Sequence, residues 1–181
     1  MAQLLFKYHT PTHFGDLLMR SDGEALTGLW FEDSHSEGKH KRDNVAEIQS
    51  IASLPPVLQD TCRWLNLYFS GQQPDFTPKY HIENLTPFRK EVSELMCQIP
   101  FGKTVTYGEI ASAVAKTHGI KKMSAQAVGG AVGWNPICII IPCHRVIGAN
   151  GSLTGYGGGL DNKIALLQLE GHHLSKTNLI Q

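Results

Sequence analysis

Residues 137–146 read ICIIIPCHRV, the most informative stretch of the chain. Its apolar first half predicts a buried strand that ends at Pro142 and is far shorter than the roughly 20 residues that cross a bilayer. Cys143 follows, and His144 and Arg145 after it can both carry positive charge. Since a free thiol has a pKa of about 8.5 and the thiolate is the nucleophile, a neighbouring base or cation would activate Cys143. A buried structural cysteine beside a surface histidine is the alternative, and it is commoner for an isolated pair.

Two features downstream of this stretch are unusual. Glu170 falls in the last turn of a helix predicted over residues 161–170, where the helix dipole disfavours a carboxylate. A cationic or hydrogen-bonding partner such as His144 would explain it, and an exposed glutamate is the alternative. The glycine-rich loop 155–159 lets backbone approach a flat group, which Tyr156 would cover. A flexible turn explains the loop equally well, but a phosphate-binding loop is excluded because its Gly-Lys-Ser/Thr ending is missing.

Upstream, the sequence predicts two short helices joined by a turn. Residues 106–109 form a capping box that opens a helix through about Thr117. A basic turn with Lys121 and Lys122 precedes a second helix that starts near Ser124. This arrangement resembles a helix-turn-helix, whose second helix normally enters a DNA groove. Two helices packed together for structural reasons remain the alternative.

The rest of the pattern predicts an α+β protein. A small αβ domain with an antiparallel sheet is expected over residues 1–80, and a mainly helical domain with the helix-turn-helix and the cysteine over residues 81–181. The expected segments are strands at 4–8, 14–19 and 26–31, a turn at 21–23, an exposed loop at 33–44, a helix from 57 to 69, a linker at 71–81 and a helix from Thr86-Pro87 to Ile99.

Composition restricts the partners and the compartment. The 181 residues include 16 basic and 16 acidic side chains, which are unevenly distributed. Residues 1–85 contain 7 basic and 11 acidic side chains, whereas residues 86–181 contain 9 basic and 5 acidic ones. The second half is therefore the better candidate to meet an anionic partner. Four scattered cysteines form no disulfide framework, and the N-terminus lacks the features of a signal peptide. We expect a cytoplasmic protein without membrane association. The other cysteines receive structural interpretations: Cys62 and Cys97 on apolar helix faces, and Cys138 near a pocket wall.

The sequence around Cys143 resembles the active-site signature of O6-alkylguanine-DNA alkyltransferases, also called methylated-DNA–protein-cysteine methyltransferases. The resemblance is dense over about residues 86–171. It includes residues 142–146, 127–131, Asn135-Pro136, Gly155-Tyr156, 158–160, Lys163 and 169–171. Residues 1–85 match only in general shape, for which the family implies a ribonuclease-H-like fold.

The resemblance implies a single-turnover DNA repair reaction. Cys143 accepts the alkyl group from the O6 atom of a guanine flipped out of the duplex, and O4-alkylthymine is expected as a further substrate. Glu170, His144 and a bound water deprotonate the thiol. Tyr107 helps to rotate the nucleotide and protonates the departing base. No metal or organic cofactor is implied, and the protein is expected to act as a monomer.

The resemblance also assigns binding residues. Lys163 assists the development of charge, and Asn135 braces the recognition helix against the active-site strand. Tyr156 and Gly157 line the base pocket, while the backbone carbonyls of Cys143 and Val146 receive the guanine amino group. The second helix of the motif meets the minor groove through Ser124, Ala125, Gln126, Ala127 and Gly129.

The chain departs from the family at Gln126, where an arginine usually fills the gap left by the extruded base. Three other kinds of protein were weighed against the alkyltransferase. A damage marker that binds the lesion without accepting the group would lack Cys143. A Cys-His hydrolase needs an oxyanion hole, which no motif indicates. A structural zinc module needs a Cys/His cluster, and none has the spacing of zinc ligands.

Overall fold

The computed structural model describes residues 4–11, 13–33, 46–47 and 50–174. It divides into two compact units, Met1–Glu83 and Asn84–Gln181. The predicted loop at residues 33–44 lies outside the described residues except for Asp33. Among the described residues, no helix combines the length and the apolar character needed to cross a membrane.

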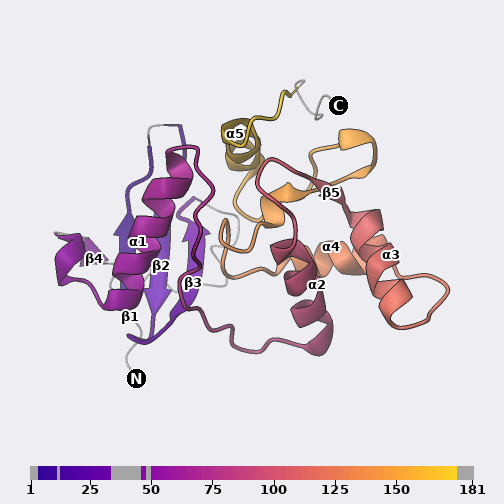
Figure 1. Cartoon of the computed structure of the whole chain (residues 1–181), viewed down its shortest axis with the longest axis horizontal. Helices are drawn as coiled ribbons and strands as arrows, with labels where there is room; N and C mark the ends of the chain where they lie inside the picture. Colours follow the sequence, from indigo (N-terminus) through magenta and orange to yellow (C-terminus); the bar gives the residue numbers. More distant parts are fainter. Residues whose placement is uncertain (1–3, 12, 34–45, 48–49, 175–181) are drawn as a thin grey trace. The chain divides into compact units, whose positions relative to one another are not determined.

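In the residues of the first unit that the structure describes, a sheet is covered by the long helix α1, Pro56–Phe69 (Figure 1). The strands are β1 (Leu4–Tyr8), β2 (Leu17–Ser21), β3 (Leu26–Phe31) and β4 (Ala46–Glu47), in the order β3-β2-β1-β4. Strands β1 to β3 are antiparallel, as expected, and the short β4 pairs parallel with β1. The second strand begins at Leu17 instead of Phe14, and the Phe14 amide donates to the Pro11 carbonyl instead of to a neighbouring strand.

The helix α1 (Pro56–Phe69) follows a short 3-10 turn, η1 (Ile51–Ser53). Proline at its first position suits a helix start, since that amide has no partner within the helix. Leu58, Cys62 and Leu65 are fully buried at helical spacing, so the expected structural role of Cys62 is confirmed. The α+β fold class is likewise confirmed.

Up to residue 174, where the described part of the second unit ends, it contains four α-helices and a small parallel sheet. Its elements are α2 (Pro87–Cys97), β5 (Val105–Thr106), α3 (Tyr107–Thr117), α4 (Ala125–Gly133), η2 (Cys143–Arg145), β6 (Val146–Ile147), η3 (Ala149–Gly151) and α5 (Leu160–Leu169). Local capping explains the starts of three helices. The side chains of Thr86, Thr106 and Ser124 accept from backbone amides of α2, α3 and α4, and the capping box of Thr106 and Glu109 is complete.

Helices α2, α3 and α4 pack together, and α3 and α4 form the expected pair joined by a turn (Figure 1). Helix α2 ends at Cys97, short of the predicted Ile99. Cys97 is exposed, so its assignment to a buried apolar face was wrong. Strand β5 pairs with β6 through Val105 and Val146, which brings the start of α3 beside the residues that follow Cys143.

The predicted strand over residues 137–141 is wrong, although all five residues are buried. The segment folds into successive tight turns, and Ile139 has a positive φ of 68°. The Cys143 amide donates to the Ile141 carbonyl, two residues back. The physical reason is Asn135, whose side chain accepts from the Ile137 amide and donates to the Ile137 and Ile141 carbonyls. These bonds replace those of a neighbouring strand.

Candidate active site

The thiol of Cys143 lies at the start of η2, where the buried turns end. The residue is 7% exposed, and the Asn135 side-chain amide donates to Sγ over 3.1 Å. Burial raises the pKa of the thiol, while the Asn135 hydrogen bond and the nearby Lys163 ammonium act in the opposite direction. A donor and a cation at the sulfur favour the thiolate over the neutral thiol. The Asn135 side chain therefore contacts the sulfur of Cys143 directly.

His144 and Glu170 meet as the sequence suggested. The His144 Nε2 atom lies 2.7 Å from a carboxylate oxygen of Glu170, and both side chains are fully buried. Glu170 is the C-cap of α5, the position at which a carboxylate is electrostatically unfavourable without a partner. A hydrogen bond from Nε2 to the carboxylate leaves Nδ1 as the basic nitrogen of a neutral imidazole.

Arg145 has a partner that the sequence interpretation did not anticipate. Its guanidinium donates to both carboxylate oxygens of Glu170 over 2.9–3.1 Å and to the Ile99 carbonyl over 2.7 Å. The Gly102 amide donates to the same carboxylate over 3.0 Å. Arg145 was expected to act as a cation beside the thiol, but it instead neutralises Glu170. A charged residue immediately after the Cys-His pair was the available signal, and its partner lies 25 residues away.

The charges of this cluster follow from burial and from Arg145. Burial opposes ionisation of Glu170, but the hydrogen bonds and charges of His144 and Arg145 outweigh it and lower its pKa to about 2. Burial also lowers the pKa of His144, although Glu170 acts against this shift. Because a guanidinium is always protonated, Arg145 suffices to keep the carboxylate ionised. At neutral pH the cluster therefore presents an anionic Glu170, a cationic Arg145 and a neutral His144.

Lys163 projects from α5 into the interior and is fully buried. Its ammonium donates to the Val146 carbonyl over 2.7 Å and to the Thr154 carbonyl over 3.3 Å. Burial lowers its pKa to about 8, and the Cys143 thiolate acts against that shift. The ammonium is therefore still mostly protonated at neutral pH, but it loses its proton more readily than an exposed lysine does. The Val146 carbonyl, expected to receive the guanine amino group, already accepts from Lys163 and has a second lone pair available.

Lys163→Met will change how stability depends on pH. The folded-state pKa of about 8 lies below the ordinary value of 10.5, so the unfolded chain binds more protons between these two values. The free energy of unfolding of the wild-type protein should therefore rise with pH across this window, relative to that of the variant. Urea unfolding of both proteins at several pH values measures the difference. Parallel pH profiles would contradict the burial of a titrating lysine.

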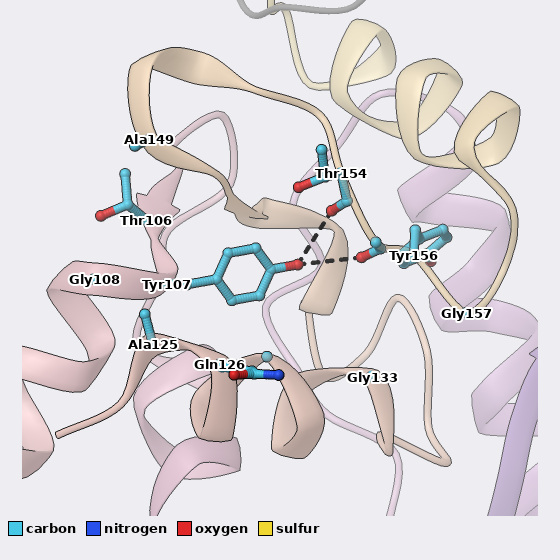
Figure 2. Close-up of a pocket in the computed structure, with 12 residues that line it drawn as sticks. Thr106, Tyr107, Gly108, Ala125, Gln126, Gly133, Ala149, Thr154, Tyr156 and Gly157 are labelled. Carbon is cyan, nitrogen blue, oxygen red and sulfur yellow. Dashed lines mark hydrogen bonds between the residues drawn. The ribbon is translucent and has the colours of Figure 1, made fainter.

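A pocket of about 820 Å³ opens between α3, α4 and the loop after η3 (Figure 2). Its lining residues are Thr106, Tyr107, Gly108, Ala125, Gln126, Gly129, Gly133, Ala149, Thr154, Gly155, Tyr156 and Gly157. Six of the predicted site residues are among them. The others are not among the lining residues. Cys143, His144, Val146, Lys163 and Glu170 are buried, Asn135 is partly buried, and Ser124 and Ala127 lie on exposed positions at the start of α4.

Tyr107 lines the pocket, and its phenol is influenced by the charge of Cys143. Its hydroxyl donates to the carbonyls of Thr154 and Gly155 over 3.3 and 3.1 Å, and its ring stands between Gln126 and the Thr154 loop (Figure 2). Burial, followed by the Cys143 charge, raises its pKa to about 12, so the phenol is protonated at neutral pH. The Thr154 carbonyl accepts from both Tyr107 and Lys163. Thr154 was not predicted, because a backbone carbonyl leaves no trace in the residue type.

The small residues of α4 leave its outer face open. A Cβ atom at Gly130 or Gly133 would meet nothing within 4 Å, and one at Gly129 would only touch the Tyr107 ring at 3.9 Å. Close packing against another helix of the described chain therefore does not account for these glycines. Beyond the end of α5, His172 is partly buried and His173 is exposed.

Comparisons with known proteins agree with this geometry. Residues 87–172 match the family described as 6-O-methylguanine DNA methyltransferase, DNA binding domain. A methylated-DNA–protein-cysteine methyltransferase of Haemophilus influenzae is 37% identical over 173 residues, which cover 94% of this chain and 88% of the relative. The Mycobacterium tuberculosis O6-methylguanine methyltransferase superposes with a TM-score of 0.74 at 36% identity, over 93% of each chain.

The M. tuberculosis protein in complex with DNA is also similar, with a TM-score of 0.73 and 36% identity over 92% of this chain and 91% of the other. These similarities extend through both compact units, whereas the family match covers the second unit alone. Sequence identity above 30% over nearly the whole length of this chain and of its relatives establishes the relationship. The chain belongs to the methylated-DNA–protein-cysteine methyltransferase family.

Proposed function

We propose that this protein repairs alkylated DNA by moving the alkyl group from a guanine O6 atom onto Cys143, once per molecule. The observation that carries the proposal is the hydrogen-bonded sulfur of Cys143 immediately before a neutral His144 that is fixed on Glu170. In the reaction a bond forms between Sγ and the alkyl carbon, and the bond from that carbon to O6 breaks. The electron pair of the broken bond stays with the guanine. The thioether is stable, so the protein is consumed.

The proton of the thiol leaves through a bound water to Nδ1 of His144. Glu170 holds the imidazole in the tautomer in which Nδ1 is the basic nitrogen, and it stabilises the imidazolium that forms. Arg145 keeps Glu170 ionised and oriented, so it acts as a positioning residue. Lys163 and Asn135 stabilise negative charge on the sulfur before attack. The cluster thus assists a thiol whose pKa burial has raised.

Tyr107 supplies the proton for the departing guanine, because its phenol is protonated at neutral pH and contacts the pocket. Tyr156 and Gly157 line the same pocket and would flank the flipped base. The carbonyls of Cys143 and Val146 would receive the exocyclic amino group. We extend the proposal to O4-alkylthymine, which presents the same kind of alkylated oxygen.

We propose that the partner is double-stranded DNA, contacted in the minor groove by the start of α4. The open face of Ala125, Gln126 and Gly129 borders the pocket, as a base flipped from that groove requires. The M. tuberculosis relative has been solved with DNA, which supports this partner. We further propose that the protein acts as a monomer in the cytoplasm and needs no cofactor.

The test uses a duplex oligonucleotide with one O6-methylguanine. After mixing, the intact protein and its Cys143 peptide are weighed, and a gain of one methyl group on that peptide is expected. Cys143→Ser should show no gain, and Cys97→Ser, at an exposed cysteine, is the matched control that should still be methylated. Tight binding without a mass change would instead identify a damage marker. Hydrolysis of an ester or amide would identify a hydrolase.

Gln126→Arg should speed repair in duplex DNA. Gln126 lines the pocket beside Tyr107, and glutamine can hydrogen-bond the orphaned cytosine but offers no cation or stacking plane. We expect the arginine variant to bind the duplex more tightly and capture the lesion severalfold faster, while transfer from a free O6-alkylguanine base stays the same. Single-turnover kinetics with both substrates measures this.

The matched control for added charge is Gln98→Arg, at an exposed position outside the pocket. An equal acceleration by both variants would show that net charge alone is responsible. An unchanged duplex rate in Gln126→Arg would contradict the role given to this position.

A further inference from the structure

A second groove lies on the helix pair, beside the pocket that the proposed reaction uses. It has a volume of about 490 Å³ and is lined by residues of α3, of the α3–α4 turn and of the start of α4. We call it the basic groove, because Lys116, Lys121 and Lys122 all line it. The sequence analysis singled out the last two lysines, and the proposed reaction leaves them without a role.

The charge of the basic groove has one sign. All three lysines are exposed, and no aspartate or glutamate is among the lining residues. Over residues 50–174 of the described chain, none of the three makes an ion pair with a carboxylate. The carboxylate of Glu91, on α2, instead contacts His118 over 2.8 Å. Three cations with no neutralising partner in one concave surface attract a polyanion.

The basic groove continues into the pocket. Gly108, in the first turn of α3, and Ala125, the first residue of α4, line both cavities. An extended chain that crosses the start of α4 can therefore pass from one cavity into the other. Ile120, 45% exposed, and Met123 add apolar surface that suits a deoxyribose between charged groups. This continuity favours a nucleic-acid backbone over a separate acidic peptide.

We infer that the basic groove binds the phosphate backbone of the strand flanking the flipped nucleotide, through Lys116, Lys121 and Lys122. The inference rests on the proposed function for the identity of the duplex. It adds a sequence-independent contact surface to the pocket. Such contacts raise affinity by releasing counterions from DNA, so their contribution depends on salt. They also fix the register of the protein on the duplex without reading its sequence.

The test measures binding of the full-length protein to an unmodified duplex oligonucleotide at several salt concentrations. Each phosphate contact contributes about 0.9 to the slope of log affinity against log salt. The double variant Lys121→Gln/Lys122→Gln should therefore lower the slope by about 2. Between about 50 and about 200 mM salt, the wild-type affinity should fall about tenfold more than that of the variant. The control is Lys79→Gln/Lys90→Gln, which removes two exposed lysines outside the groove.

The second readout is the ratio of alkyl transfer rates from duplex DNA and from a free O6-alkylguanine base. This ratio should fall in the Lys121→Gln/Lys122→Gln variant, because a free base has no phosphates. An unchanged salt slope, an equal loss in the control variant, or stronger binding to a polyglutamate peptide than to DNA would overturn the inference. If the wild-type protein binds DNA with the expected slope but Cys143 is never alkylated, the proposed function fails and the groove assignment stands.

Discussion

Glu170→Gln is expected to destabilise the second unit by about 3–5 kcal/mol and to slow alkyl transfer by a factor on the order of 10² or more. The substitution preserves shape but removes the negative charge that pairs with the buried Arg145 guanidinium. It also removes the carboxylate that orients and polarises His144. Stability is measured by urea unfolding at neutral pH, and transfer by single-turnover kinetics with the free base, which needs no DNA contacts.

The Glu170→Gln variant should also lack the part of the acid-induced loss of stability that comes from protonation of Glu170. The pKa of Glu170 is lowered from 4.5 to about 2 in the folded state, so its stabilisation is complete above 4.5 and is lost as pH falls through about 2. In the variant this loss should be absent. Glu94→Gln is the matched control, because Glu94 is exposed on α2 and its contact with Lys90 spans 3.9 Å. The control should change stability by less than about 1 kcal/mol. Equal effects of both variants would contradict the buried cluster.

Asn135→Asp is expected to slow alkyl transfer to Cys143 by a factor on the order of 10². Aspartate keeps an acceptor for the Ile137 amide but has no N–H for the sulfur of Cys143. It also places a negative charge beside the thiol, which raises the thiol pKa further and reduces the thiolate population. The rate of Cys143 alkylation by a free O6-alkylguanine base, measured as a function of pH, tests this effect. The rise of that rate with pH should occur at higher pH in the variant than in the wild-type protein.

Asn135→Ala separates the electrostatic effect from the structural one. It removes the same donor without adding charge, and it leaves the carbonyls of Ile137 and Ile141 without their side-chain partner, at about 1–3 kcal/mol for each group left unsatisfied. Because aspartate also lacks this N–H donor, both variants should lose stability, but the shift of the pH profile should be smaller in Asn135→Ala than in Asn135→Asp. If Asn135→Asp reacted at the wild-type rate and pH, the amide would have no part in activating the sulfur.

Local signals in the sequence predicted the helices of the second unit well. Thr86, Thr106 and Ser124 cap their helices as expected, because a cap is a contact between residues three positions apart. The pairing of His144 with Glu170 was also anticipated, but from the resemblance and from an unfavourable carboxylate at a helix end. The cysteine, histidine and glutamate could therefore be named before any geometry was known.

Side-chain contacts that no sequence pattern revealed decided the rest. The apolar run 137–141 reads as a strand, and it became a series of turns because the Asn135 amide supplied the hydrogen bonds that a neighbouring strand would have made. The sequence suggested that Arg145 is a cation beside the thiol. In the structure its guanidinium instead hydrogen-bonds the carboxylate of Glu170 at the end of α5. The sequence by itself determined which groups can react and where helices begin. The tertiary structure alone decided which charges neutralise one another, because burial makes ionisation depend on partners that only folding brings within a few ångströms.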